Sequence, residues 1–384
     1  MKRNPHTTPW LAWTSQLALL LALTLALASC GGASDTTSDG ETGADTGTDK
    51  GGTAAAQEFI VALETDVVQF DPIKIGDATT SSVAGQIMEQ LVQRTADGQL
   101  TGALAESWES DATGSTWTFH LRPGVTFHDG STFDSSVVKW HFERAMSDES
   151  NFKSQFSIIS NIETPDANTV IFHLKQPSAA FIDYTILTNG GFIPSKQAYE
   201  TKGEAFASEP VGTGPFKWDR WVQGQRVELV RNEDWWGDGP KINKLIFRVI
   251  PEANTQVIEL QTGGVDLITR ASAQDLQQLQ ADENLVVKIA PAYRTRYYSL
   301  NTATAPFDDI RVRQAFNHAL DLSSIVNAVA APLTVATDSL IPQASWAYPG
   351  PGSLPSYAYD VDKAVQLLEQ AGYTRSSEGT WSKD

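Results

Sequence analysis

Three histidines, His120, His128 and His141, lie near the carboxylate of Asp129 in the sequence, and all four side chains are of types that bind metals. A metal site needs ligands at a defined spacing, and this spacing matches no common zinc or transition-metal pattern. His120 falls on the polar side of an alternating, strand-like segment, and His128 precedes an Asp-Gly turn. We interpret these histidines as surface or turn residues and predict neither a metal site nor a cofactor.

Other short patterns suggest catalysis, but each has a simpler explanation. The adjacent acids Asp308–Asp309 and Glu233–Asp234 suit helix capping and the positive end of a helix better than acid/base chemistry. The sequence Gly212–Pro215 (GTGP) differs in spacing from a phosphate-binding loop, and proline lacks the N–H group that such a loop needs, so we predict a rigid turn. No serine-hydrolase, zinc-protease or nucleotide-binding motif occurs in the sequence. We therefore predict that the protein is not an enzyme.

The composition excludes several classes of protein. The 384 residues include 28 Lys and Arg against 46 Asp and Glu, a formal charge of -18, which disfavours binding to nucleic acid. One cysteine cannot form an internal disulfide, and together with six histidines it cannot form a Cys-rich zinc module. The length is sufficient for two domains.

The N-terminus has the pattern of a secretion signal. Lys2 and Arg3 precede the apolar run Leu17–Ala28, which is too short to cross a bilayer. The following Cys30 stands in a sequence (LASC) that resembles the lipobox of bacterial lipoproteins. Residues 31–56 have no large apolar side chain, so they cannot bury enough surface to fold. We predict a signal peptide over 1–29, then a lipidated Cys30 and a disordered linker over 30–56.

The remaining residues predict alternating strands and helices. Trp117, Phe119 and Leu121 alternate with polar residues as in a half-buried strand. Asp134 or Ser135 caps a predicted helix, and Ser272 with Asp275 forms the pattern of a capping box. Further strands are predicted over 245–250, 265–268 and 285–289, and further helices over 252–262, 309–320 and 360–371. This alternation favours an α/β architecture.

Four segments in a fixed order resemble the extracytoplasmic solute-binding proteins of ABC importers, in the family 5 that handles dipeptides, oligopeptides and nickel. These segments are Leu104–Met146, Val211–Gly237, Ile250–Ile268 and Tyr297–Asp321. The resemblance implies an α/β fold of the two-lobed periplasmic binding protein type II-like class (cluster C), with a hinge and an extra subdomain in the first lobe. We expect the first lobe over 57–293, its subdomain over about 80–180, and the second lobe over 294–384. Because members of this family usually continue further, we expect the second lobe to be incomplete at its C-terminus.

The resemblance also implies a ligand site between the lobes. By position, the residues that would face the ligand are Asp77, Thr269, Arg270, Arg294, Tyr297 and Trp346. Asp77 could receive a ligand amine and an arginine could bind a carboxylate. Tyr297 or Trp346 could provide an apolar wall with a polar edge. For each residue, an ordinary surface or hinge contact is the alternative interpretation.

The implied function is binding without chemistry. We expect a monomer, lipid-anchored at Cys30 outside the cytoplasm, that captures a peptide-like solute and delivers it to ABC permease subunits. Nickel chelates and oligosaccharides are alternative ligands, and a non-transporting sensor or chaperone is an alternative role. The pair Trp235–Trp236 leaves sugar binding open, because it could stack on a sugar ring; filling the edge of a sheet is the commoner use of such a pair.

Overall fold

The computed structural model describes residues 57–290 and 292–383. The predicted signal peptide, lipidated Cys30 and linker lie outside the described residues. The described residues all belong to one compact unit, Ala54–Asp384, so the predicted division between lobes at 293/294 stays a prediction. Within this described part of the chain, no helix has both the length and the apolar character needed to cross a membrane.

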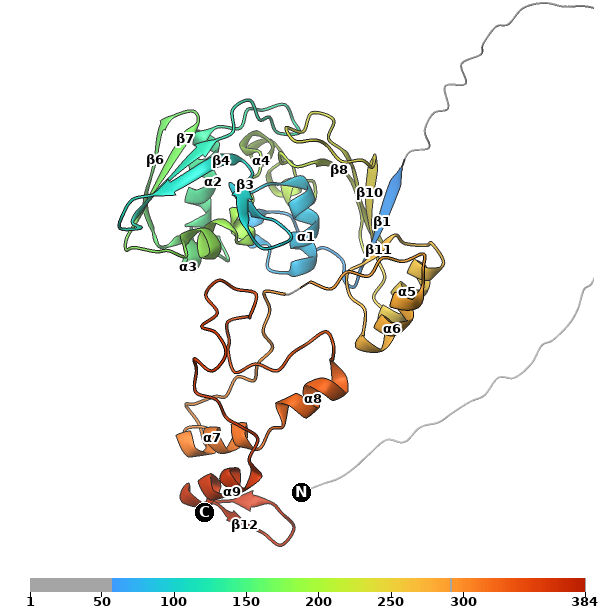
Figure 1. Ribbon diagram of the computed structural model, residues 1–384. Coiled ribbons are helices and arrows are strands. Elements are labelled where there is room, and N and C mark those ends of the chain that lie inside the picture. Colours follow the sequence, from blue (N-terminus) through green and yellow to red (C-terminus); the bar gives the residue numbers. More distant parts are fainter. Residues whose placement is uncertain (1–56, 291, 384) are drawn as a thin grey trace, which may run out of the picture. The chain divides into compact units, whose positions relative to one another are not determined.

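A five-stranded sheet, with the order β11–β1–β10–β9–β8, organises the first core (Figure 1). Its strands are β1 (Glu58–Leu63), β8 (Phe216–Val222), β9 (Arg226–Arg231), β10 (Lys244–Val249) and β11 (Leu267–Ile268). β1 runs parallel to β10 and to β11, whereas β9 runs antiparallel to both of its neighbours, β8 and β10. The apolar end of β1, residues 61–63, is buried because both faces of the sheet are covered there: Val61 and Leu63 lie in one core and Ala62 in another.

Helices flank this sheet and return the chain to it. They are α1 (Ala78–Ile87), α4 (Lys196–Lys202), α5 (Ala253–Gln261) and α6 (Ala273–Ala281). Val83, Ala84 and Ile87 of α1 are buried in the same core as the inner faces of β1 and β9. β10, α5 and β11 follow one another in the chain, so the connection passes over β1, which lies between the two strands. The carboxyl ends of β1, β10 and β11 therefore meet at one edge of the sheet.

A four-stranded antiparallel sheet, in the order β4–β5–β7–β6, supports a second core. Its strands are β4 (Ala105–Ser110), β5 (Thr116–Leu121), β6 (Ile159–Asp166) and β7 (Thr169–Leu174), and the neighbouring elements are β2 (Val92–Arg94), β3 (Leu100–Gly102), α2 (Ser135–Ala145) and α3 (Lys153–Phe156). Phe142 of α2 packs on Phe172 of β7 with ring centroids 4.9 Å apart. This core spans Ile73 to Ile193, and the predicted subdomain over about 80–180 stays a prediction.

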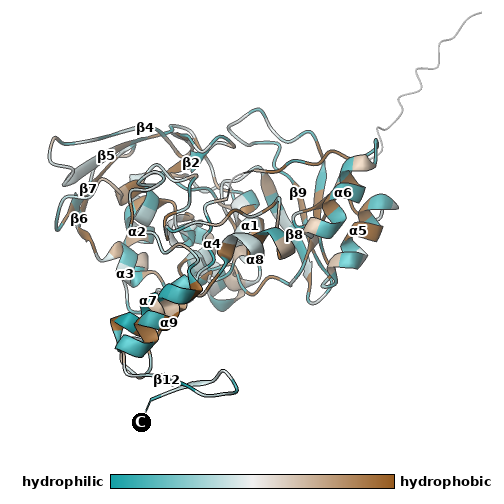
Figure 2. Cartoon of the chain, turned by 60° about the horizontal axis from the view of Figure 1, so that its bottom comes forward, coloured by the Kyte–Doolittle hydropathy of each residue, from teal (hydrophilic) through white to brown (hydrophobic). Residues whose placement is uncertain are grey.

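The segment 292–383, about the last quarter of the chain, has little regular structure. It contains α7 (Ile310–His318), α8 (Leu322–Val329), α9 (Val361–Gln370), β12 (Thr374–Arg375) and β13 (Trp381–Ser382). Ala315 of α7 packs with Ala364 and Leu367 of α9 in a small core. Figure 2 shows hydrophilic and hydrophobic residues side by side along both of these helices. In α8 no residue is buried, so its apolar side chains face outward.

The capping patterns in the sequence predicted helix starts correctly, whereas an apolar run alone did not predict a strand. The capping box of Ser272 and Asp275 and the cap at Asp134 are confirmed, because each carboxylate or hydroxyl accepts a backbone N–H of its helix. The strand predicted over 285–289 is wrong: this segment forms no ladder, and Val286 is 83% exposed. An apolar run without a neighbouring strand cannot satisfy its backbone groups as a sheet does.

Candidate binding site

The carboxyl ends of two parallel strands bring three polar residues together. Glu64 directly follows β1, while Thr269 and Arg270 directly follow β11, and the register pairs Ala62 with Ile268. The Arg270 guanidinium donates a hydrogen bond to Glu64 Oε2 at 2.8 Å. Ligands of open α/β sheets bind outside the carboxyl ends of the strands, so this edge is the first candidate site.

Asp77 approaches the same edge through α1. Its Oδ1 accepts the backbone N–H of Thr80 at 2.7 Å and caps the helix, while its Oδ2 accepts no hydrogen bond from the described residues. The first turn of α1 contacts the segment that follows β1, because the hydroxyls of Thr79 and Thr65 lie 3.0 Å apart. Asp77 thus serves as a helix cap and still has one oxygen for a ligand amine.

The charges at this edge are exposed and their pairing is weak. The Arg270 side chain is 55% exposed and the Glu64 side chain 38%. Ion pairs in such surroundings contribute less than about 1 kcal/mol to stability. A ligand that carries an ammonium and a carboxylate group can therefore take over both partners at small cost.

Trp346 has none of its hydrogen bonds to the described residues at this sheet edge. Its indole N–H donates to Asp183 Oδ2 at 2.8 Å, and Asp183 also forms an ion pair with Arg94. These three residues line a hollow of about 480 Å³ together with Tyr293, whose ring centroid is 5.5 Å from the Arg94 guanidinium carbon. Sequence reasoning missed Arg94 and Asp183, because their pairing joins positions far apart in the chain.

Arg294 and Tyr297 stand in an irregular segment. Both side chains are exposed, and no hydrogen bond or ion pair joins either of them to another of the described residues. Of the six predicted residues, Thr269 and Arg270 thus follow β11, and Asp77 caps the helix whose first turn contacts the segment after β1. Trp346 lines the hollow, and Arg294 and Tyr297 share no partner among the described residues.

The tryptophan pair that left sugar binding open is held by a buried carboxylate. Trp236 donates to Glu89 Oε2 at 3.0 Å and Trp235 to Glu89 Oε1 at 3.4 Å, and the Thr213 hydroxyl also donates to Glu89. Burial raises the pKa of Glu89, although these hydrogen bonds oppose the shift. The Arg122 guanidinium covers the Trp236 ring at 3.9 Å. These contacts support the interpretation of the pair as a structural plug.

The histidines show no common metal site. His128 lies in a turn, as predicted, and contacts the carbonyl of Gly214 at 2.9 Å. The interpretation of His141 as a surface or turn residue is wrong: it is fully buried in α2, where it contacts the carbonyl of Gly190 at 2.7 Å. Burial lowers the pKa of His128 to about 4 and that of His141 to about 3, so both rings are neutral at pH 7. Among residues 57–290 and 292–383, no three His, Cys, Asp or Glu side chains gather as metal ligands would.

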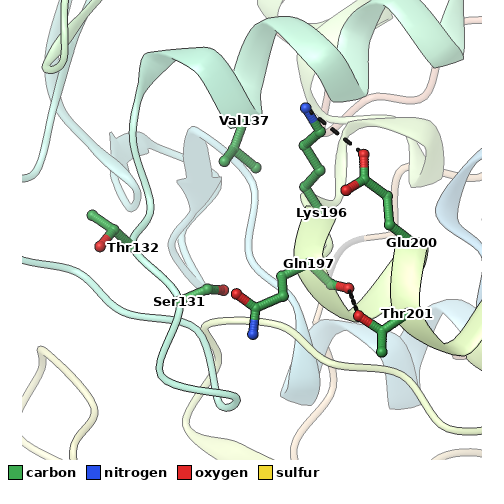
Figure 3. A pocket seen from close by; sticks show the side chains of 7 residues that line it. All are labelled: Ser131, Thr132, Val137, Lys196, Gln197, Glu200 and Thr201. Carbon is green, nitrogen blue, oxygen red and sulfur yellow. Dashed lines mark hydrogen bonds and ion pairs between the residues drawn. The ribbon is translucent and has the colours of Figure 1, made fainter.

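A second hollow, of about 360 Å³, lies between α4 and the loop at 131–132 (Figure 3). Lys196 and Glu200 in its lining pair with each other at 3.8 Å, and Thr201 donates to the carbonyl of Gln197. Its polar groups are therefore mostly satisfied within α4, and we assign it no role.

Comparisons with known proteins show which family the chain resembles over most of its length. The family model of bacterial extracellular solute-binding proteins, family 5 Middle, matches residues 99–382. The glutathione-binding protein GsiB of Escherichia coli (strain K12) is 32% identical over 334 residues, which are 85% of this chain and 64% of GsiB. The chain therefore spans less than two thirds of the length of that relative.

Two solved structures are also similar. The periplasmic binding protein DppA from Helicobacter pylori, in complex with the peptide STSA, has 29% identity and a TM-score of 0.73, over 83% of this chain and 67% of DppA. NikZ from Campylobacter jejuni, in complex with Ni(L-His), has 27% identity and a TM-score of 0.75, over 85% of this chain and 65% of NikZ.

Proposed function

Because the chain belongs to the bacterial extracellular solute-binding proteins of family 5, we propose that it captures a peptide-like solute and delivers it to ABC permease subunits. The likeness to DppA and NikZ confirms the predicted fold class, the α/β, two-lobed type II-like fold of periplasmic binding proteins. The family consists of solute-binding proteins, and our proposal includes that this chain has no catalytic activity of its own. It also includes a monomeric state and an anchor at a lipidated Cys30.

The observation that carries the proposal is the edge formed by Asp77, Glu64 and Arg270. It offers a carboxylate oxygen without a partner, and an arginine whose only ion-pair partner among the described residues is an exposed glutamate. A zwitterionic peptide presents the two matching charges, an ammonium for a carboxylate and a carboxylate for the guanidinium. Thr269, exposed beside Arg270, adds a hydroxyl that can donate or accept.

The test is a thermal melt and a calorimetric titration of the detergent-solubilised full chain. The probes are the tetrapeptide Ser-Thr-Ser-Ala, reduced glutathione, Ni(L-His) and cello-oligosaccharides. A peptide at about 100 times its dissociation constant should add about 2.7 kcal/mol of stability. The proposal fails if the chain melts cooperatively and no peptide raises the transition.

Nickel chelates remain the second candidate because NikZ, a similar structure, is in complex with Ni(L-His). A melt raised by Ni(L-His) and not by free Ni²⁺ or by peptides would favour this candidate. Genes for two permeases and two ATPases beside this one would support an importer over a sensor or chaperone.

A further inference from the structure

We propose that the hollow lined by Arg94, Asp183, Tyr293 and Trp346 is a subsite for a neutral, hydrogen-bonding part of a peptide ligand. The inference rests on the proposed function and adds to it a preference for uncharged polar residues at one ligand position.

The size and walls of the hollow suit part of a small solute. Its volume of about 480 Å³ falls within the range of ligand pockets, roughly 300–1,000 Å³. The Tyr293 and Trp346 side chains are 51% and 64% exposed, so each ring has a free face. The bond from the indole of Trp346 to Asp183 fixes one of these walls without a ligand. Aromatic walls held in this way cost little entropy when a ligand binds.

The charges in the hollow cancel. Arg94 and Asp183 form an ion pair in which each side chain is about three-quarters buried, and Arg94 also donates to the carbonyl of Gly98. Both oxygens of Asp183 are in use, one by Arg94 and one by Trp346. A charged ligand group entering the hollow would lose hydration without meeting an unpaired opposite charge. The hollow therefore disfavours charged groups.

Besides the Trp346 indole, the uncharged hydrogen-bonding groups of the lining are two side-chain amides, Gln90 and Gln93, and the hydroxyls of Tyr293 and Ser345. Gln90 donates to the carbonyl of Thr188 at 2.6 Å, and its side-chain oxygen accepts no hydrogen bond from the described residues. Gln93 is exposed and its side chain makes no hydrogen bond with another of the described residues. Side-chain amides offer one acceptor and two donor hydrogens each, which complements a peptide bond or an Asn or Gln side chain.

The test changes the charge of the hollow and measures the resulting ligand preference. Pentaalanine peptides carrying a single Gln, Asp or Lys at each position in turn are titrated into the full chain and its Gln93→Lys variant. In the wild type, one position should prefer Gln over both Asp and Lys by about tenfold. In Gln93→Lys, the same position should shift by about tenfold toward Asp. Gln278→Lys, which adds the same charge on α6, should leave the preference unchanged.

A second variant tests the wall. Trp346→Ala should weaken binding of the Gln-containing peptide about tenfold, whereas Tyr359→Ala, at a tyrosine that is 55% exposed outside the hollow, should not. If the wild type binds peptides but neither Gln93→Lys nor Trp346→Ala changes affinity or preference, the subsite is refuted and the proposed function stands. If no peptide binds the wild type, the proposed function has failed, and the subsite fails with it.

Discussion

Arg270 and Glu64 are 206 positions apart in the chain, yet a 2.8 Å hydrogen bond joins them where β11 and β1 end side by side. The parallel pairing of the two strands places these residues together, and each keeps enough exposure to exchange its partner for a ligand group. The pair is therefore the most direct target for mutation.

Replacing Arg270 should weaken peptide binding while leaving the free energy of unfolding almost unchanged. Arg270→Gln should weaken peptide binding at least tenfold, because a bidentate guanidinium–carboxylate contact is lost. The free energy of unfolding should change by less than about 1 kcal/mol, as the pair with Glu64 is exposed. Calorimetry and urea denaturation measure the two effects. Arg231→Gln, which breaks the similarly exposed pair with Glu233, is the control and should not affect binding. Equal affinities for Arg270→Gln and the wild type would place the ligand elsewhere.

Glu228 should stabilise the large sheet through its charge. Its side chain is 3% exposed and pairs with Arg220, Arg226 and Lys244. Burial alone would raise its pKa, but the hydrogen bonds from the three cations outweigh burial and hold it at about 2. Glu228→Gln should lower the unfolding free energy at pH 7 by about 2–3 kcal/mol, as expected for buried hydrogen bonds to charged groups.

The same residue gives a pH dependence with a defined sign. Because the pKa of Glu228 is lower in the folded state than its usual value of 4.5, its contribution is complete above pH 4.5 and is lost as the pH falls toward 2. Denaturation curves at pH 7 and pH 3 should show the stability gap between wild type and Glu228→Gln shrinking. A gap that is constant between these values would contradict the assigned ion pairs.

His141 should also make the protein less stable as the pH falls, but over a higher pH range than Glu228. Burial lowers its pKa from 6.5 to about 3, so protons bind the unfolded chain first as the pH falls. Stability should decrease by about 1.4 kcal/mol per pH unit for this one group between pH 6.5 and pH 3. Unfolding measured at pH 7 and pH 5 should show a smaller decrease in His141→Gln than in the wild type. His120→Gln, at an exposed histidine, is the control.

Gly212 should tolerate no side chain. A Cβ at this position would lie 2.2 Å from the carbonyl oxygen of Ile87, which is backbone and cannot move aside. Gly212→Ala should therefore destabilise the fold by several kcal/mol, within the range of severe core changes. At Gly76 a Cβ would meet no atom within 4 Å, so Gly76→Ala should be close to neutral in the same thermal melt. Equal melting temperatures for both variants would disprove the close approach.

The sequence predicted what depends on local patterns. Caps at Asp134 and Ser272 were recognisable because one side chain and the next turn of backbone suffice to form them. The turn at Gly212–Pro215 was also recognisable, but its reason, the close contact with Ile87, was not.

The candidate site was predictable in part. Asp77, Thr269 and Arg270 followed from a family resemblance, and Thr269 and Arg270 indeed come directly after a strand. Glu64, Arg94 and Asp183 were missed because their importance comes from partners that are distant in the chain, at positions 270, 183 and 346. Pairing between distant side chains leaves no periodicity or spacing to detect.

The parallel pairing of β1 with β10 also has a consequence for biosynthesis. Glu58 pairs with Lys244, so the N-terminal strand cannot complete its ladder until the chain has grown through β10. At ribosomal rates of about 5–20 residues per second, roughly ten to forty seconds pass between the synthesis of the apolar residues Phe59–Leu63 of β1 and that of their partners in β10. During that interval β1 has an unpaired, apolar edge, which requires protection from premature aggregation.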